Sequence, residues 1–235
     1  MSGRSTDDPV PPEILRAELE RVWAAFDAGG LAIVPLDVAY AVVGTTERAI
    51  RALFAAKQRS YDKPSGMFGS WRLSDETHDL PDEKRAMIRT LIEEEKLPFS
   101  VVAPFRRDAR MFLKVEPFVL ESSSKAGTLD MLLNAGQFHE AMAEQSRRRG
   151  VPVFGSSANR SLQGSRYRLQ DIDAEVRQAA AVEIDHGRSK YANEHGRSST
   201  IVDFRDWTVV RVGVCFDRLA EAFRRRFGIA LRVPD

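Results

Sequence analysis

One stretch of the chain, residues 31–64, constrains the fold more strongly than any other. It opens with the apolar sequence LAIVP, which predicts a buried strand, and continues through a polar and aromatic turn. A helix is expected to follow, with Thr46 near its N-cap and the cations Lys57 and Arg59 at its end. A strand, a turn and a helix in this order are typical of α/β proteins, which place charged groups at the mouth of a sheet. The same pattern also fits an ordinary strand and helix whose basic end is exposed to water.

Strands and helices alternate along the rest of the chain, and a β-hairpin is expected near its end. The sequence is 43% hydrophobic, which is enough for a substantial core. These features predict one mixed α/β domain, residues 11–235, preceded by a flexible tail, residues 1–10. Residues 106–126 give no clear prediction. The expected helices are 11–28, 46–59, 81–96, 135–149, 169–180 and 215–227, and the expected strands are 31–35, 67–71, 98–103, 128–133, 151–154, 182–185, 199–204 and 207–212.

Several classes of protein are disfavoured by what the sequence lacks. The formal net charge is +1, so overall charge does not predict nucleic-acid binding, although Arg147–Arg149 and Arg224–Arg226 are short basic runs. Cys215 is the only cysteine, so no disulfide can form within the chain. There is no GxxxxGK[ST] or GxGxxG sequence and no metal-ligand spacing of histidines, so we expect neither a P-loop nor a protein metal site. With no hydrophobic signal and no apolar run of about 18 residues, we expect a cytoplasmic protein that does not enter a membrane.

Three predicted strand ends carry groups that suit phosphate. The first holds Asp37 and Tyr40 together with the two helix-end cations, the second is Ser156–Ser161, and the third is Ser198–Thr200. Small hydroxyls and backbone N–H groups bind phosphate without steric hindrance, and Lys or Arg balances its charge. Such clusters also occur in simple turns. Because they recur beside a cationic helix end, we predict a phosphate-binding site.

Several short motifs occur in a defined order along the chain. PLDVAYA occupies positions 35–41, and the remaining motifs are Lys57-Gln58-Arg59, Ser157-Ala158-Asn159, Ser199-Thr200-Ile201-Val202-Asp203 and Arg211-Val212-Gly213. In order and spacing, over residues 15–220, the chain resembles the YrdC-type threonylcarbamoyl-AMP synthase family, whose motifs read PTDTxYG, KxR, SAN, STIVD and RxG.

The resemblance implies a fold and a reaction. The fold is a single α/β domain whose twisted mixed sheet has an open, concave, positively charged face. The reaction is a nucleotidyl transfer in which threonine and bicarbonate form a carbamate that attacks ATP and expels pyrophosphate. The product, threonylcarbamoyl-adenylate, is used in tRNA modification. The expected ligands are ATP with Mg²⁺, bicarbonate and an amino acid.

The resemblance also assigns roles to individual residues. Two cations would be catalytic and hold bicarbonate and phosphates, namely Lys57 and Arg59. The nucleotide-binding side chains would be Ser157, Asn159, Ser199 and Arg211. The substrate-binding side chains would be Asp37, Tyr40 and Ser100. On this interpretation, replacing Lys57 with alanine is expected to abolish turnover while leaving the melting temperature almost unchanged.

The chain departs from the family pattern at several positions, and the departures leave alternatives open. Leu36 and Val38 replace both threonines of PTDTxYG, and no arginine lies near 132–134, where the family has its RxP motif. Deleting one partner of a polar contact weakens binding strongly. The chain is therefore expected to make threonylcarbamoyl-adenylate or a related carbamoyl-adenylate, or to act on another small molecule in a biosynthetic pathway, or to bind nucleotide or RNA without catalysis.

Overall fold

The stretch that dominates the sequence folds as two adjacent strands followed by a helix. In the computed structural model, which describes residues 4–234, β1 (Leu31–Val34) pairs antiparallel with β2 (Ala41–Gly44), and α2 (Glu47–Ala56) follows. Thr46 is the N-cap of α2, as predicted, because its hydroxyl accepts a backbone N–H from the first turn. We did not predict β2, because its four residues lie between a turn and a helix cap and give too short a pattern.

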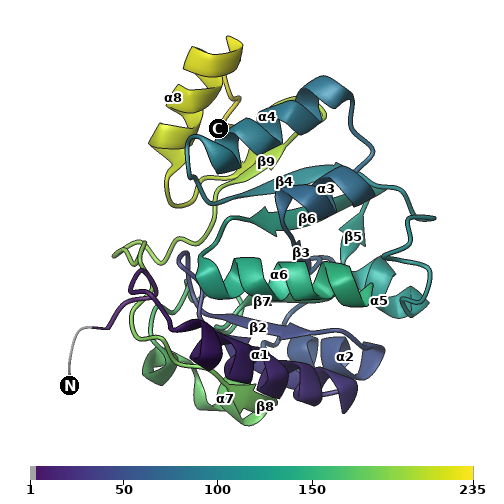
Figure 1. Cartoon of the computed structure of the whole chain (residues 1–235), viewed down its shortest axis with the longest axis vertical. Helices are drawn as coiled ribbons and strands as arrows, with labels where there is room; N and C mark the ends of the chain where they lie inside the picture. The colour runs from purple at the N-terminus through teal and green to yellow at the C-terminus, as the bar shows by residue number, and fades with distance from the viewer. Residues whose placement is uncertain (1–3, 235) are drawn as a thin grey trace.

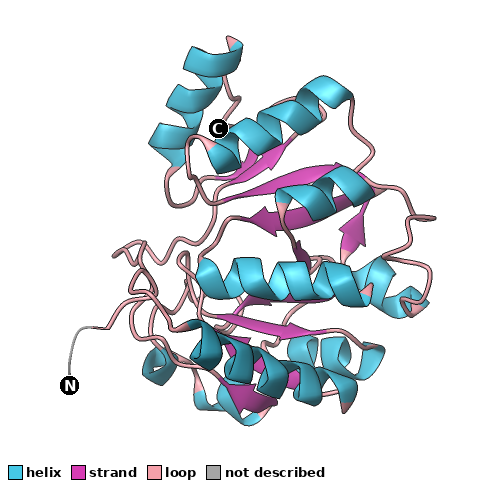
Figure 2. Cartoon of the chain, in the orientation of Figure 1, coloured by secondary structure: helices cyan, strands magenta, loops and turns pink. Residues whose placement is uncertain are grey.

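The strands of the described residues form one mixed sheet of ten strands (Figure 1, Figure 2). Their order is β10-β9-β4-β6-β3-β7-β2-β1-β8, with β5 paired to β6. Three pairs are parallel (β1–β8, β3–β6 and β4–β9) and the others are antiparallel, which confirms the predicted mixed sheet. The strands not yet bounded are β3 (Gly66–Phe68), β4 (Phe99–Pro104), β5 (Ser124–Lys125), β6 (Thr128–Leu133), β7 (Val153–Ser157), β8 (Ala180–Glu183), β9 (Ile201–Asp203) and β10 (Thr208–Arg211).

Most helices also form where the sequence predicts them. One prediction was wrong: residues 169–180 form only a short 3-10 turn (Leu169–Asp171) and α7 (Ala174–Gln178), because the backbone between them leaves the helical conformation, with ψ angles of 134° at Ile172 and 135° at Asp173. The predicted strand 67–71 is divided between β3 and the start of α3. The other helices are α1 (Pro12–Asp27), α3 (Trp71–Thr77), α4 (Asp82–Glu93), α5 (Pro117–Ser122), α6 (Gln137–Arg149) and α8 (Phe216–Phe227).

The two faces of the sheet carry separate core clusters. On one face, α1 and α6 pack against β1, β2, β3 and β7, with Trp23 and Phe138 fully buried. Helices α2, α4 and α8 belong to the cluster of the other face, which includes Phe54, Leu91 and Phe223. Figure 1 shows α1 and α6 in front of the lower strands, and α4 and α8 near the top. The cluster beneath α1 and α6 includes only one residue of β6, Leu132. These two helices therefore do not cover the same face of β4, β6 and β9, and a binding site can form there.

The predicted tail, residues 1–10, is held against the domain in its described part. The backbone N–H of Thr6 donates to the carbonyl of Arg188 at 2.9 Å, and the Thr6 hydroxyl accepts the N–H of Lys190 at 3.0 Å. Val10 is buried. Residues 1–3 lie outside the described part of the chain. No helix of residues 4–234 is both long enough and apolar enough to cross a bilayer.

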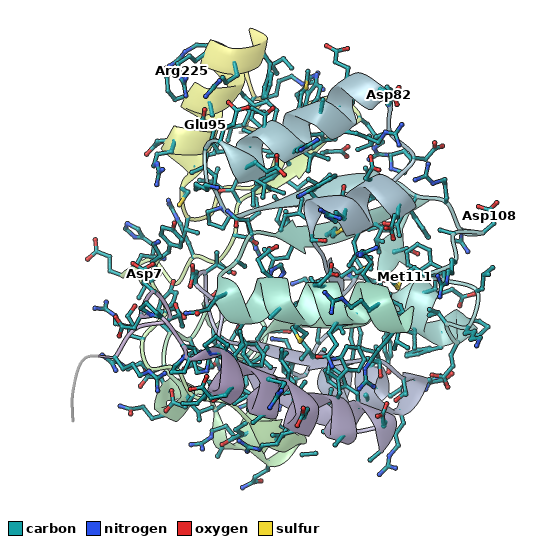
Figure 3. All side chains as sticks on the ribbon, in the orientation of Figure 1. Asp7, Asp82, Glu95, Asp108, Met111 and Arg225 are labelled. Atoms are coloured by element: carbon teal, nitrogen blue, oxygen red, sulfur yellow. The ribbon has the colours of Figure 1, made fainter. Side chains whose placement is uncertain are left out.

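The two basic runs that the sequence places at helix ends are paired with acidic side chains. Arg225 and Arg226 of α8 both contact Glu95, which follows α4, at 2.8 Å (Figure 3). Arg147 of α6 contacts Glu144 at 3.1 Å and one further glutamate. These runs therefore join elements of the fold and carry little unpaired charge.

Candidate functional site

The uncovered part of the sheet face forms the wall of a cavity of about 770 Å³. Along β4, β6 and β9 the lining residues alternate, as expected for one face of a sheet, and include Ser100 and Val102 of β4, Asp130 and Leu132 of β6, and Ile201 of β9. The register confirms that they are neighbours, since Ser100 lies opposite both Leu132 and Ile201. The volume lies within the range of pockets that hold small organic ligands.

Two arginines from distant parts of the chain line this cavity. Arg59, beyond the end of α2, donates to the carbonyls of Lys63 and Pro64 at 2.9 and 2.8 Å. Arg211 of β10 donates to the carbonyl of Ser199 at 3.1 and 2.8 Å and to its hydroxyl at 3.0 Å. Neither guanidinium forms a salt bridge within residues 4–234. Burial and the nearby Arg211 lower the pKa of Arg59, so an anion bound between the two would relieve unfavourable positive charge.

Further cations and hydroxyls surround the two arginines. Lys63 and Lys125 also line the cavity, and neither has a salt-bridge partner in the part of the chain that the structure describes. Arg205 differs, because it pairs with Asp203 at 2.7 Å. The sequence analysis did not select the two lysines, since lysines in polar loops are common and carry no motif.

A chain of hydroxyls connects Arg211 to the centre of the sheet. The hydroxyls of Ser199 and Ser100 lie 3.2 Å apart, and Ser157 lines the cavity from β7. The structure thus brings together six of the predicted site residues along one cavity: Tyr40, Arg59, Ser100, Ser157, Ser199 and Arg211.

Asp130 lies in the same cavity, and the sequence analysis missed it. It belongs to β6, opposite Val102, and its Oδ1 atom is inaccessible to solvent and has no hydrogen-bond partner among the described residues. Burial raises the pKa of its carboxyl group to about 6, although Arg211, Ser100 and Arg59 act in the opposite direction. Gly66 leaves room for it, because a Cβ atom there would lie 3.3 Å from Oδ2. The sequence feature that could have revealed Asp130 is a single acidic residue inside the otherwise apolar strand TLDMLL.

Lys57 does not line the cavity, contrary to the catalytic role that we expected. It is the C-cap of α2, its side chain is 1% exposed, and its ammonium group donates to the carbonyls of Ser157 and Asn159. Burial, and secondarily Arg59, lower the pKa of Lys57 to about 7. Lys57 therefore contacts the end of β7 from outside the cavity, and these buried contacts lead us to expect a loss of stability when it is replaced. Its catalytic role stays a prediction.

Asn159 and Asp37 also lie outside the cavity lining. The Asn159 side chain is buried and donates to the carbonyl of Arg160 at 2.6 Å. The Asp37 carboxylate lies against Gly136 at the start of α6, and its backbone N–H donates to Ala135. Both residues hold loops in place behind the cavity.

Tyr40 borders the cavity, but its hydroxyl group is directed elsewhere. The side chain is fully buried, and the hydroxyl donates to Asp185 and to the carbonyl of Gly187, both at 2.8 Å. Burial and Asp185 raise the pKa of Tyr40. The tyrosine therefore contributes a wall of the cavity and no free polar group.

Leu162 is a strained residue at the edge of the cavity. Its φ angle is 70° and its side chain is 90% exposed. A left-handed backbone costs about 1 kcal/mol in a residue with a Cβ atom. Replacing Leu162 with glycine is therefore expected to raise the free energy of unfolding by up to about 1 kcal/mol, measured by urea denaturation.

Leu113 provides the matched control for this prediction. It is 68% exposed but is not among the residues with positive φ. Its replacement with glycine is expected to lower stability, since glycine gains entropy in the unfolded chain. Equal effects of the two substitutions would contradict the assignment of strain to Leu162.

Comparisons with known proteins agree with this architecture. The family model Sua5_yciO_yrdC, described as Telomere recombination, matches residues 24–213. No curated protein matches the chain. A hypothetical protein of Streptococcus mutans UA159, smu.1377c, is similar in structure with a TM-score of 0.77 at 18% identity, covering 100% of both chains.

Two further solved structures share the fold. P. abyssi Sua5 complexed with L-threonine has a TM-score of 0.71 at 18% identity, covering 100% of this chain but 63% of the Sua5 chain. E. coli YciO has a TM-score of 0.64 at 18% identity, covering 90% of this chain and 94% of that chain. The present chain therefore spans less than two thirds of the length of Sua5. The predicted fold, a YrdC-like α/β domain, is confirmed.

Proposed function

The chain belongs to the Sua5/YciO/YrdC family, and from that premise we propose that it is an ATP-dependent nucleotidyltransferase acting on a small molecule. An amino acid and bicarbonate condense to a carbamate with loss of water. A carbamate oxygen then attacks the α-phosphorus of ATP, the bond from that phosphorus to the bridging oxygen breaks, and pyrophosphate leaves. The product is threonylcarbamoyl-adenylate or a related carbamoyl-adenylate, which feeds tRNA modification.

One observation carries this proposal: two arginines without acidic partners lie together with serine hydroxyls in one cavity. Arg59 and Arg211 are held by carbonyl and hydroxyl oxygens, which fixes their position without neutralising their charge. Arginine binds phosphate through two parallel hydrogen bonds, so the pair suits a polyphosphate. Phosphoryl transfer needs little covalent participation by the protein, and fixed cations lower its barrier by stabilising developing charge.

The remaining groups have supporting roles in the proposed reaction. Ser100, Ser157 and Ser199 offer short hydroxyl donors, and Lys63 and Lys125 add charge at the cavity wall. Within residues 4–234 there is no cluster of three or more acidic, histidine or cysteine side chains that suits a metal. Mg²⁺ therefore enters as part of the Mg·ATP substrate, held by its phosphates.

Pyrophosphate release tests the proposal directly. Protein, Mg·ATP and bicarbonate are incubated with and without each of the twenty amino acids. We expect release that depends on bicarbonate and on one amino acid or a small group of them. If no amino acid supports release but ATP raises the melting temperature, carbamoyl-adenylate synthesis from an amino acid is wrong, and the chain binds nucleotide only or acts on a small molecule of another class. If ATP has neither effect, the assignment of a nucleotide site is wrong as well, and RNA binding, tested by its salt dependence, takes its place.

A second candidate function is the same chemistry with a substrate other than threonine. Leu36 and Leu132 line the cavity, at positions where the family motifs have a threonine and an arginine. A pocket that loses a hydroxyl and a guanidinium binds polar substrates less well. In the same assay, a requirement for an amino acid other than threonine would support this candidate.

A further inference from the structure

Asp130 is a carboxylate that the fold itself does not require. It occupies the middle of β6, and its strand neighbours, Leu129 and Met131, are fully buried in the core on the opposite face. Its Oδ1 atom has no hydrogen-bond partner among the described residues and no access to solvent. A carboxylate in such a place is costly unless a cation or donor pairs with it. A buried ionisable group of this kind in a cavity is a candidate ligand-binding group.

The nearby cations do not satisfy this carboxylate. The charges of Arg211 and Arg59 are close enough to act against the rise in the pKa of Asp130, yet no salt bridge joins Asp130 to either arginine within residues 4–234. Both guanidiniums donate instead to backbone carbonyls. The cavity therefore presents unpaired positive groups and, in Asp130, a buried negative group that no cation of the described residues pairs, which is the complement of a ligand that carries both charges.

The surroundings of Asp130 are apolar on one side. Leu132 follows it two residues along β6 on the same face, and Leu36 and Phe68 line the same cavity. These side chains offer no hydrogen bond to a substrate hydroxyl group. They favour an aliphatic side chain by removing apolar surface from water.

We propose that Asp130 binds the positively charged amino group of the small-molecule substrate, and that this substrate is an α-amino acid with an apolar side chain. The amino group donates to the carboxylate, which accepts the proton that the nitrogen must lose before it attacks bicarbonate, and the apolar side chain packs against Leu36 and Leu132. The inference deepens the proposed function, since it names the substrate class and a residue that selects it. Asp130 is thus a specificity-determining residue of the cavity.

A divalent cation is the competing ligand for this carboxylate, and the site suits it less well. Mg²⁺ demands several oxygen ligands in octahedral geometry, and within residues 4–234 no group of three or more acidic, histidine or cysteine side chains would supply them. Two guanidiniums close by add further repulsion. An organic ammonium group needs only one or two acceptors and fits a single carboxylate.

Binding of matched ligand pairs tests the proposal independently of turnover. L-leucine and its 2-hydroxy analogue have nearly the same shape, but only L-leucine carries an ammonium group. Both are titrated calorimetrically, beside L-threonine, into the native protein with bicarbonate and a non-hydrolysable Mg·ATP analogue. We expect L-leucine to bind at least 10-fold more tightly than the hydroxy acid and more tightly than L-threonine. The absence of this preference for the amine, including the absence of any binding, would overturn the proposal.

The variant Asp130→Asn identifies the residue responsible. It is expected to lose about 10- to 100-fold in affinity for L-leucine. Its affinity for the ATP analogue is expected to stay the same or to rise, because a negative charge has left the cavity. An unchanged affinity for leucine would refute the proposal, and so would a higher Mg²⁺ requirement for nucleotide binding, which would identify Asp130 as a metal ligand.

Asp62→Asn is the matched control. Asp62 also lines the cavity but is exposed, so its substitution is expected to leave the preference for leucine over the hydroxy acid intact. An equal loss in both variants would show a general charge effect and would overturn the specific role of Asp130. Because these titrations do not need catalysis, amine binding through Asp130 can be established even if no pyrophosphate is released. The proposed reaction and the proposed role of Asp130 can therefore be refuted independently of each other.

Discussion

Replacing Arg211 with alanine is expected to weaken the binding of ATP and of pyrophosphate by roughly 30- to 1,000-fold, a loss of about 2–4 kcal/mol. The reason is that Arg211 is fixed at the cavity by the carbonyl and hydroxyl of Ser199 and has no acidic partner within residues 4–234. The full positive charge of the Arg211 guanidinium would therefore act on a bound phosphate. The affinity is measured by titration calorimetry at constant ionic strength, because salt screens such contacts.

Arg205 gives a matched control for this prediction. It lines the same cavity, but Asp203 neutralises it at 2.7 Å. Replacing Arg205 with alanine is therefore expected to change nucleotide affinity less than about threefold, since the half-exposed guanidinium is screened by solvent and already balanced by Asp203. Both variants should unfold close to the native midpoint in urea. If the two substitutions weakened nucleotide binding equally, the distinction between paired and unpaired arginines would be wrong, and overall charge would explain the binding.

Sequence reasoning predicted the frame of the domain because its longer elements carry clear signals. Apolar periodicity and end signals located α1, α4, α6 and α8 within a few residues, and Gly150 ends α6 in the left-handed conformation that glycine favours. β2 was missed because four residues between a turn and a cap carry no period. The predicted helix at 169–180 failed because tertiary contacts, and not local preference, decide so short a segment.

The candidate site was predicted less completely, because a motif names residues but not the direction of their side chains. Six predicted residues line the cavity, and five of them lie on or beside β2, β4, β7, β9 and β10 of one sheet. The motifs also included Lys57, Asn159 and Asp37, whose side chains turn toward loops behind the cavity. Asp130 belongs to no motif, so only the register of β6 against β4 revealed it.

Lys57 leads to the second large prediction, which concerns stability and pH. The variant Lys57→Met keeps most of the side-chain volume but removes the ammonium donor from the carbonyls of Ser157 and Asn159. The Ser157 carbonyl still accepts the backbone N–H of Asn159 at 2.9 Å, so the Asn159 carbonyl is the one that loses its donor. An unsatisfied buried carbonyl costs about 1–3 kcal/mol, so the variant is expected to lose about 1–3 kcal/mol of unfolding free energy at pH 9–10. Urea denaturation of the variant and the native protein at that pH measures the loss.

The loss should shrink as the pH falls, and this dependence identifies the buried amine. The pKa of Lys57 is about 7 in the folded chain and near 10.5 in the unfolded chain, so the unfolded state binds the additional proton between these values. The native protein therefore loses stability as the pH falls from about 10 to about 7, whereas Lys57→Met lacks this contribution. If Lys57 instead contacted substrate, the variant would retain its stability at every pH and lose nucleotide binding. The two curves of unfolding free energy against pH, measured beside nucleotide affinity, separate a support behind β7 from a group that touches the ligand.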